Sequence, residues 1–312
     1  MRILVVGAGA IGGYYGGRLL DAKQDVTFLV RPRRAAQLAA SGLQISSLMG
    51  DTQIAAPPIV LAEELKTTYD LVLLSCKAYD LEGAITSFAP AVGEKTMILP
   101  LLNGMRHLDV LDQRFGAAKV LGGLAVISTV LEPDGGIAHL NQLHSISFGE
   151  RDGSLSERAQ AVATVFATAN FVSHLSPTIV LNMWEKWVFI ASCAAITCLM
   201  RSNVGDIVAA GGASLATQLV DECAAIATSQ GFAPRESSTE QSKTMLTAVG
   251  STLAASMFRD VERGGMTEGE HMLGDLLRRG QEKGLNSPLL DVATIHLRAY
   301  EGRRKREAAA RG

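Results

Sequence analysis

The residues that point most clearly to chemistry stand at the start of the chain. Gly7, Gly9 and Gly12 form the pattern Gly-Ala-Gly-Ala-Ile-Gly directly after a short apolar run. Between a strand and a helix this pattern binds the pyrophosphate of a dinucleotide, because its glycines allow a tight turn, a close approach of the phosphates and close packing of helix on strand. Ala10 and Ile11 would then open a helix whose N-terminus faces the phosphates. The alternative is a glycine-rich turn without a ligand.

The end of the second predicted strand indicates which dinucleotide is bound. Enzymes that use NAD keep an acidic residue there for the ribose hydroxyls, whereas this chain has Arg31, followed by Arg33 and Arg34. A planar guanidinium suits the 2′-phosphate of NADP. The sequence therefore predicts NADP as the cofactor, with NADPH as the reductant. The alternative is that these arginines form only the solvated start of a helix.

Short apolar segments alternate with helical patterns through the first half and would position these residues. Strands are predicted at residues 3–6, 25–30, 71–75, 96–99 and 120–124. They are mostly apolar throughout, as in a parallel sheet buried on both faces. Residues 42–56 look like a hairpin at the edge of that sheet. This α/β pattern predicts a Rossmann-type, doubly wound parallel sheet that binds ligands at the carboxyl ends of its strands.

The second half of the chain has a different pattern. From about residue 156 it changes, and beyond residue 177 it becomes almost wholly helical, with helices predicted at 215–231, 246–261 and 269–283. A chain of 312 residues exceeds the usual size of a single core. We therefore predict an NADP-binding Rossmann domain at residues 1–176 and a C-terminal all-helical substrate and catalytic domain at residues 177–312.

Composition excludes several classes of function. Hydrophobic residues make up 47% and charged residues 19% of a chain whose net charge is −2, which predicts a folded protein without a nucleic-acid partner. The four cysteines form no CxxC pair and have no histidine at metal-ligand spacing, so no metal site is expected. The apolar run 187–200 is too short for a bilayer, and glycines interrupt the N-terminal apolar segment. A cytoplasmic protein without a membrane partner is expected.

Several separated motifs together resemble the ketopantoate reductases, also called 2-dehydropantoate 2-reductases, over nearly the whole chain. The motifs are the glycine pattern with Arg31, Ser75-Cys76-Lys77-Ala78, Asn103-Gly104-Met105, Trp184-Glu185-Lys186, and Ser256-Met257 with Glu268. The resemblance implies reduction of 2-dehydropantoate (ketopantoate) to pantoate with NADPH, in the biosynthesis of pantothenate and coenzyme A. It also implies a homodimer.

The resemblance assigns the proton donor to Lys186. Reduction of a ketone needs a proton for the forming alkoxide, and an ammonium at the carbonyl oxygen can supply it. Lys186 lies between Trp184 and Trp187, so partial desolvation should lower its pKa toward the working pH. Without the family pattern, this lysine would be interpreted as an amphipathic side chain at the edge of a core helix.

The resemblance also implies roles for four further residues. Glu268 matches the glutamate that holds the substrate hydroxyl, and Ser256 matches the serine that binds the substrate carboxylate. Asn103 matches the asparagine near the nicotinamide and the substrate, and Lys77 matches the lysine on the phosphate side of the cofactor. Alone, each would be interpreted as an ordinary surface or turn residue.

Three positions depart from the family pattern. Asparagines common in the family four and eight positions after the catalytic lysine are here Ile190 and Ala194, and another asparagine is Leu273, although nearby His271 can supply a polar group. Spacings of four and eight put Ile190 and Ala194 on the helical face of Lys186, and the loss of their amides predicts a more apolar substrate pocket.

Three functions therefore remain open. The first is ketopantoate reductase, the second is an NADPH-dependent reductase of another, more apolar 2-oxo acid, and the third is an NADP-binding sensor without turnover. The presence of Lys186 and Glu268 argues against the third, because a binding module needs no proton donor.

Overall fold

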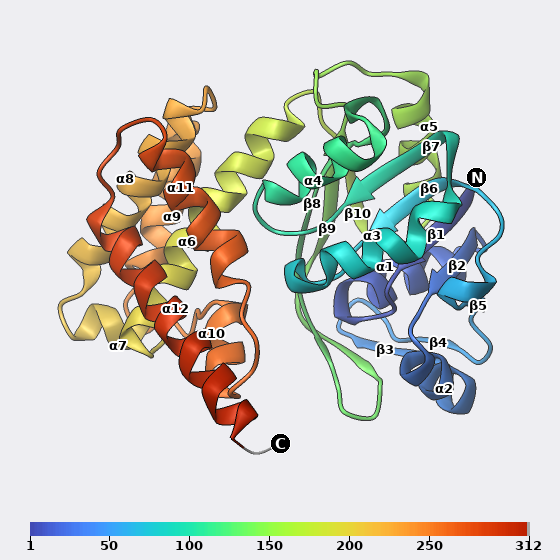
Figure 1. The fold of residues 1–312 in the computed structure, drawn as a ribbon, viewed down its shortest axis with the longest axis horizontal. Coiled ribbons are helices and arrows are strands. Elements are labelled where there is room, and N and C mark those ends of the chain that lie inside the picture. Colours follow the sequence, from blue (N-terminus) through green and yellow to red (C-terminus); the bar gives the residue numbers. More distant parts are fainter. Residues whose placement is uncertain (311–312) are drawn as a thin grey trace. The chain divides into compact units, whose positions relative to one another are not determined.

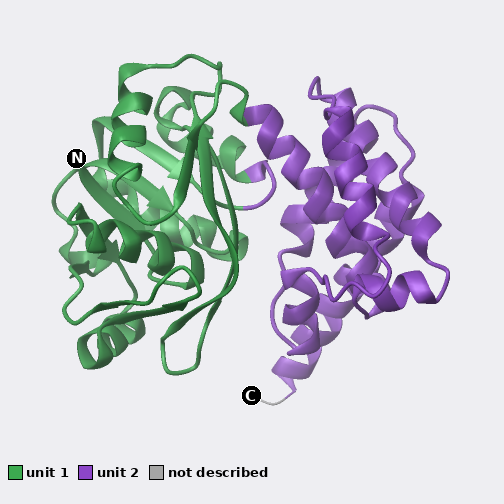
Figure 2. Ribbon diagram, turned by 180° about the vertical axis from the view of Figure 1, so that it is seen from behind, with its two compact units in different colours: residues 1–102, 107–179 green, residues 103–106, 180–312 purple. Residues whose placement is uncertain are grey.

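The computed structural model describes residues 1–310, and the chain divides into two compact units (Figure 2). The first unit comprises residues 1–102 and 107–179, and the second comprises residues 103–106 and those from 180 onward. The boundary at 179/180 lies three residues beyond the one predicted after residue 176. The short segment 103–106, which the sequence placed in the first domain, belongs with the helical unit.

A parallel sheet forms the centre of the first unit (Figure 1). Its strands are β1 (Arg2–Val6), β2 (Asp25–Leu29), β5 (Ile59–Val60), β6 (Tyr69–Leu74) and β7 (Val92–Pro100), in the order β5-β2-β1-β6-β7. The chain runs outward from β1 through β2 to β5 and then returns to β6 on the other side of β1. This reversal creates the switch point at which doubly wound folds bind ligands, and it confirms the predicted Rossmann-type fold.

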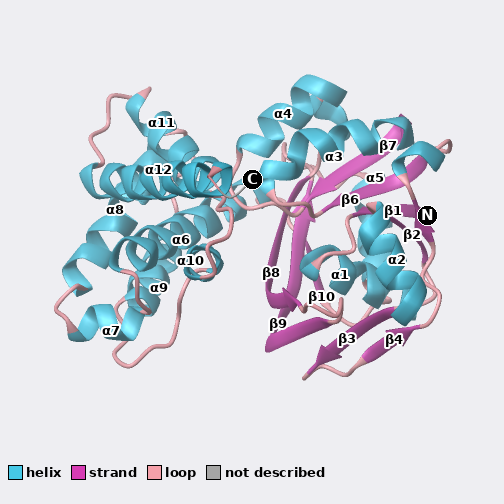
Figure 3. Ribbon diagram, turned by 60° about the horizontal axis from the view of Figure 1, so that its bottom comes forward, coloured by secondary structure: helices cyan, strands magenta, loops and turns pink. Residues whose placement is uncertain are grey.

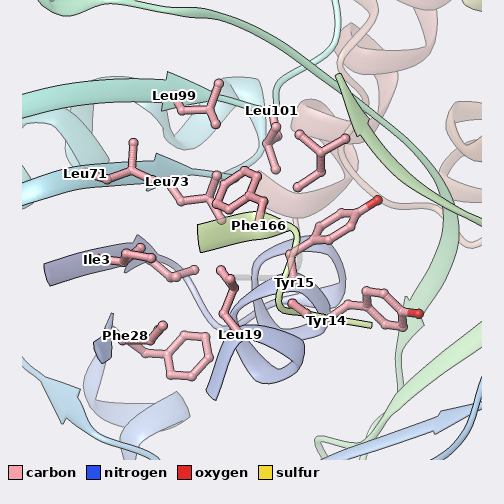
Figure 4. Packing of buried hydrophobic residues seen from close by; sticks show 14 of the residues in the cluster. Ile3, Tyr14, Tyr15, Leu19, Phe28, Leu71, Leu73, Leu99, Leu101 and Phe166 are labelled. Atoms are coloured by element: carbon pink, nitrogen blue, oxygen red, sulfur yellow. The ribbon is translucent and has the colours of Figure 1, made fainter. Parts of the chain in front are cut away.

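The helices of the first unit surround a core of buried side chains. These helices are α1 (Ala10–Asp21), α2 (Pro32–Ser41), α3 (Leu81–Phe88), α4 (Arg106–Phe115, which begins in the 103–106 segment) and α5 (Glu157–Phe166). In Figure 4, Ile3, Leu71 and Leu99 from three strands gather with Leu19 of α1 and Phe166 of α5. Each such residue contributes about 1.5–3 kcal/mol when it is fully buried.

A second sheet distinguishes this unit from a simple Rossmann domain. It contains β3 (Leu43–Ser47), β4 (Thr52–Ile54), β8 (Gly122–Leu131), β9 (Ile137–Gly149) and β10 (Val172–Leu175). The strand order is β10-β9-β3-β4, and β8 pairs antiparallel with β9. The hairpin at 42–56 is confirmed, although it belongs to this second sheet.

The prediction that residues 120–124 continue the parallel sheet is wrong. Only Val120 bridges to Ile98 of β7, and from Gly122 onward the chain pairs with β9. The first residues of β8 are as buried as a central strand, whereas its later residues are half exposed. Burial on both faces therefore produced the apolar run, and it carried no information about which strand was the partner.

The second unit is built from helices and loops, and Figure 3 shows no strand in its described part. Its helices are α6 (Ile179–Met200), α7 (Val204–Ala209), α8 (Ala213–Ser229), α9 (Glu236–Leu246), α10 (Ser256–Glu262), a π-helical turn (Glu270–Gly274), α11 (Asp275–Gln281) and α12 (Pro288–Ala309). The helices predicted at 215–231 and 269–283 correspond to α8 and to the π turn with α11.

The predicted continuous helix at 246–261 is wrong, because a loop separates α9 from α10. Gly250 has a φ of +68°, which a helix does not allow. In this loop the carbonyls of Ser251 and Leu253 accept hydrogen bonds from the amides of Gly205 and Val204 at 2.8 and 2.9 Å. The loop backbone therefore satisfies amides in the first turn of α7 that have no partner inside that helix.

Helix α6 is the one helix among residues 1–310 whose length and composition would allow it to cross a membrane. Of its most apolar window, 67% is buried within the protein, which is the pattern of the core helix of a soluble protein. This burial agrees with the prediction of a buried helix at 187–200.

Candidate active site

The glycine turn offers an open cradle of backbone at the carboxyl end of β1. Gly7 has a φ of +92°, and a Cβ atom added at Gly7 or Gly9 would meet nothing within 4 Å. Gly9 caps α1 and makes no side-chain hydrogen bond to the first turn of the helix, and the amides of a first turn have no partner inside the helix. These features fit the pyrophosphate of a dinucleotide.

Gly12 serves packing rather than ligand approach. A Cβ atom there would stand 2.2 Å from the carbonyl oxygen of Gly7 and 2.2 Å from Oγ of Ser75. The third glycine of the pattern therefore lets α1 lie close to the ends of β1 and β6, as predicted for this position.

Arg31 lies two residues after the end of β2, beside a carboxylate that the sequence did not indicate. Its Nη2 is 2.7 Å from Oδ1 of Asp80, which lies in the turn after β6. The hydrogen bond and the charge of Asp80 raise the pKa of Arg31. The Arg31 side chain remains 73% exposed, so it is accessible to a phosphate. The signal for Asp80 was its place just after the predicted strand 71–75, at the same sheet edge as Arg31.

The other basic residues of this edge differ in their contacts. Lys77 is exposed and precedes the turn that contains Asp80. Arg34 is held by the protein itself, because its Nε donates to the carbonyl of Ala8 and its Nη1 donates to the carbonyl of Gly135, both at 2.9 Å. Arg34 therefore braces the glycine turn, whereas Arg31, Arg33 and Lys77 have exposed side chains at this edge.

In the second unit, α6 carries Lys186 into a buried environment. The neighbouring Trp184 and Trp187 are 2% and 0% exposed. Burial lowers the pKa of Lys186 to about 8, although the negative charge of Glu268 acts in the opposite direction. A lysine with this pKa exchanges its proton near neutral pH, as a general acid must. The lowered pKa agrees with the expectation from the two tryptophans.

Three residues from distant parts of the sequence meet around Lys186. The Nζ of Lys186 donates to Oδ1 of Asn103 at 2.9 Å, and Glu268 lies near enough for its charge to act on Lys186. The carbonyl of Asn103 is 2.9 Å from Nε2 of His271. His271 lies three positions after Glu268, and the sequence had indicated it only as a polar group near Leu273.

The remaining predicted positions lie elsewhere in the second unit. Ser256 is the first residue of α10 and has an exposed side chain, and none of the contacts around Lys186 includes it. Ile190 is partly exposed, whereas Ala194 is 2% and Leu273 0% exposed. Ala194 and Leu273 therefore belong to the core of the unit, and of the three departures Ile190 alone is partly exposed.

Comparison with known proteins identifies relatives along nearly the whole chain. Residues 3–153 match the family model "Ketopantoate reductase PanE/ApbA", and residues 178–301 match that of its C-terminal domain. An uncharacterized oxidoreductase, YkpB of Bacillus subtilis, is 36% identical over 96% of this chain and 99% of its own.

Two solved structures share the fold over both units. The 2-dehydropantoate 2-reductase of Geobacter metallireducens has a TM-score of 0.88 and 28% identity, and the match covers 96% of this chain and 99% of that chain. A D-mandelate dehydrogenase, solved with NADH and anilino(oxo)acetate, has a TM-score of 0.87, and the match covers 98% of this chain and 100% of that chain. Its identity of 21% supports the fold alone. The family models cover most of the chain in two consecutive matches, and the chain therefore belongs to the ketopantoate reductase PanE/ApbA family.

Proposed function

We propose that this protein is an oxidoreductase that reduces the keto group of a 2-oxo acid with NADPH, and that ketopantoate is its substrate. The observation that carries the proposal is the half-buried Lys186, whose pKa is lowered to about 8 and whose Nζ is held by Asn103. A desolvated ammonium that can release its proton near neutral pH suits the protonation of an alkoxide. It has no use in a module that only binds a dinucleotide.

The residues of the first unit suit the binding of the cofactor. The open backbone at Gly7 and Gly9 and the first-turn amides of Ala10 and Ile11 would hold the pyrophosphate, while Arg31 and Lys77 would hold the 2′-phosphate. When bound, NADPH supplies the hydride. The family membership supports a nicotinamide cofactor, and Arg31 in the place of an acid favours NADPH over NADH.

The residues of the second unit suit the handling of the substrate and its proton. Lys186 would polarise the keto oxygen and protonate it as the hydride of NADPH reaches the carbon, so that a C–H and an O–H bond form and the C=O double bond becomes a single bond. Asn103 orients the ammonium through its amide oxygen. Glu268 would accept a hydrogen bond from the substrate hydroxyl, and Ser256 would donate one to its carboxylate. In this proposal Lys186 and Glu268 are the catalytic residues.

A second candidate is the reduction of a 2-oxo acid without a hydroxyl group. The observation that favours it is Ile190, which is partly exposed one helical turn after Lys186, where the family commonly carries an asparagine. An apolar site separates close analogues by only about 1–3 kcal/mol, whereas a site that hydrogen-bonds a hydroxyl discriminates by several powers of ten.

Oxidation of NADPH with a panel of 2-oxo acids tests both candidates. We expect the efficiency with ketopantoate to exceed that with 2-oxoisovalerate, which lacks the hydroxyl. A preference for 2-oxoisovalerate that the variant Ile190→Asn reverses would replace the first candidate with the second. An absence of turnover with every acid, combined with tight binding of NADPH, would favour the sensor. Because Ala194 is buried, Ala194→Asn would test packing rather than specificity.

Assembly and location complete the proposal. We also propose a homodimer in the cytoplasm, as the resemblance to the family implies, with a 2-oxo acid as the small-molecule partner. Light scattering of the purified protein would measure its mass directly, and a mass of one chain would contradict the dimer.

A further inference from the structure

His271 makes a contact that the proposed chemistry does not require. It lies in the π-helical turn Glu270–Gly274, and its Nε2 is 2.9 Å from the carbonyl oxygen of Asn103. The side chain of the same asparagine accepts the hydrogen bond from Lys186. Asn103 is therefore held at two points, because its main-chain carbonyl is hydrogen-bonded to His271 and its side-chain amide is hydrogen-bonded to Lys186. All three residues belong to the second unit.

The chemistry of the contact determines the form of the imidazole. A carbonyl oxygen can only accept a hydrogen bond, so Nε2 of His271 must carry a hydrogen and donate it. Burial lowers the pKa of His271, against the opposing effects of Glu268 and of the bond to Asn103. Near neutral pH the ring is therefore neutral, with its hydrogen on Nε2. A ring fixed in this form acts as a hydrogen-bond donor and does not supply protons to the reaction.

Two neighbouring features fix the positions of His271 and Asn103 relative to α6. The indole Nε1 of Trp187, the residue after Lys186, donates to the carbonyl of Met272 at 3.0 Å, which ties the π turn to α6. Gly104 has a φ of +77°, and a Cβ atom there would lie 3.3 Å from the imidazole. The chain can therefore turn sharply against the ring immediately after Asn103. Single π turns inside helices occur frequently at functional sites.

We propose that His271 is a positioning residue, which holds the main chain of Asn103 so that the amide oxygen of Asn103 directs the ammonium of Lys186. This inference rests on the proposed function and adds a residue to it. Lys186 has a long, flexible side chain, and a displacement of about 1 Å in a catalytic group can reduce turnover by about 100-fold. The contact between His271 and Asn103 keeps the amide oxygen of Asn103, to which the ammonium of Lys186 donates, in place between turnovers.

Three substitutions separate positioning from mere packing. His271→Gln places an amide N–H near the position of Nε2 and should preserve the bond to Asn103. His271→Asn is too short to reach that carbonyl, and His271→Phe fills the space without a donor. We expect kcat to fall about 10- to 100-fold in the Asn and Phe variants and to stay within about threefold of wild type in His271→Gln. The Kd of NADPH should be the same in all three.

The pH dependence provides a readout that packing alone would not move. An amide oxygen that accepts from the Lys186 ammonium stabilises its charged form, so loss of the aligned acceptor should lower the pKa of Lys186. In His271→Asn and His271→Phe the pH at which kcat is half-maximal should move below its wild-type value, and in His271→Gln it should not move. His174→Phe, at an exposed position of β10, serves as the control and should change neither quantity.

Titration of Lys186 without substrate distinguishes this inference from the proposed function. The rate at which acetic anhydride acylates Lys186 at different pH values reports its pKa even if no 2-oxo acid is reduced. A lowered pKa in His271→Asn, restored in His271→Gln, supports positioning whether or not ketopantoate is the substrate. Equal acylation profiles and equal kcat in wild type, His271→Asn and His271→Phe would overturn it, as would a loss in His271→Gln as large as that in His271→Phe.

Discussion

At the scale of single residues, burial dominates the chemistry of Lys186. The negative charge of Glu268 favours the ammonium, yet burial on α6 outweighs it and lowers the pKa from 10.5 to about 8. Nζ donates a hydrogen bond to the neutral amide oxygen of Asn103, which orients the ammonium without adding a charge. The result is an oriented proton donor whose proton remains available near neutral pH.

The rate of reduction should therefore depend on pH in one direction. The ammonium is the active form and is lost as the pH rises through about 8, so kcat should be level below pH 8 and fall above it. Lys186→Met should lower kcat by about 100-fold or more and leave the Kd of NADPH unchanged. The exposed Lys283→Met is the control. A pH profile that stays level to pH 10 would place the proton donor elsewhere.

The same substitution should stabilise the fold. A lysine whose pKa is lowered in the folded protein destabilises that state below the folded pKa, and the effect disappears as the pH rises toward the unfolded value. At pH 7, Lys186→Met should raise the free energy of unfolding by about 1–2 kcal/mol, after allowance for the lost bond to Asn103. Urea unfolding at pH 7 measures this change, and a destabilised variant would contradict it.

The pair of Arg31 and Asp80 should set the selectivity for the cofactor. Asp80 forms an ion pair with the guanidinium of Arg31, to which we assign the 2′-phosphate of NADPH. An exposed ion pair of this kind contributes about 0.2–1 kcal/mol. Asp80→Asn should therefore lower the Kd of NADPH by about two- to fivefold and leave the Kd of NADH unchanged. Arg31→Asp should weaken NADPH by about 2 kcal/mol or more and spare NADH. Fluorescence titrations measure both, and equal effects on the two cofactors would remove Arg31 from the phosphate site.

At the scale of elements, α1 lies between the two sheets of the first unit and approaches both through glycines. A Cβ atom at Gly16 would stand 2.5 Å from Phe28 of β2, and one at Gly17 would stand 2.7 Å from Ile45 of β3. Gly12 and Gly16 therefore face the parallel sheet, whereas Gly13 and Gly17 face the second sheet. The backbone of α1, which begins at the glycine turn, therefore packs closely against a sheet on each of two sides.

Two alanine substitutions separate packing from ligand approach in this helix. Gly12→Ala should lower the free energy of unfolding by about 3 kcal/mol or more, because the added methyl group collides with the backbone oxygen of Gly7. Gly9→Ala meets nothing in the protein and should change stability by less than about 1 kcal/mol, yet it should weaken NADPH about tenfold or more. If Gly9→Ala binds NADPH like wild type, the pyrophosphate does not approach the turn at Gly9.

At the scale of the whole molecule, the candidate groups divide between the two units. The first unit carries the dinucleotide cradle and Arg31, and the second carries Lys186, Glu268, His271 and, through the segment 103–106, Asn103. Asn103 follows β7 by three residues in the chain but makes its hydrogen bonds within the helical unit.

The binding of cofactor should therefore be separable from the chemistry. NADPH at 100 times its Kd should raise the free energy of unfolding by about 2.7 kcal/mol, equally in wild type and in Lys186→Met. In Arg31→Asp the same concentration of NADPH should stabilise the protein less. Thermal unfolding of the full chain measures these differences. If NADPH did not stabilise Lys186→Met, Lys186 would belong to the cofactor site.

The sequence by itself determined strands β1, β2, β6 and β7 and several of the helices, because hydrophobic periodicity, glycine spacing and helix patterns depend on neighbouring residues, but it did not predict β9 or β10. It predicted the strand, turn and helix at Gly7–Gly12, the hairpin at 42–56 and the helical second half. Local patterns report burial but do not identify the partner, which explains why residues 120–124 were assigned to the wrong sheet. The family pattern selected Lys186 and Glu268, whose roles stay predictions.

The tertiary structure alone decided which side chains meet. Asp80 reaches Arg31 across 49 positions, Asn103 reaches Lys186 across 83 positions, and His271 reaches Asn103 across 168 positions. No local periodicity encodes such pairs, because strand order and helix packing bring them together only after the chain has folded. For the same reason, the sequence could not show that Ala194 and Leu273 are buried in the core of the helical unit.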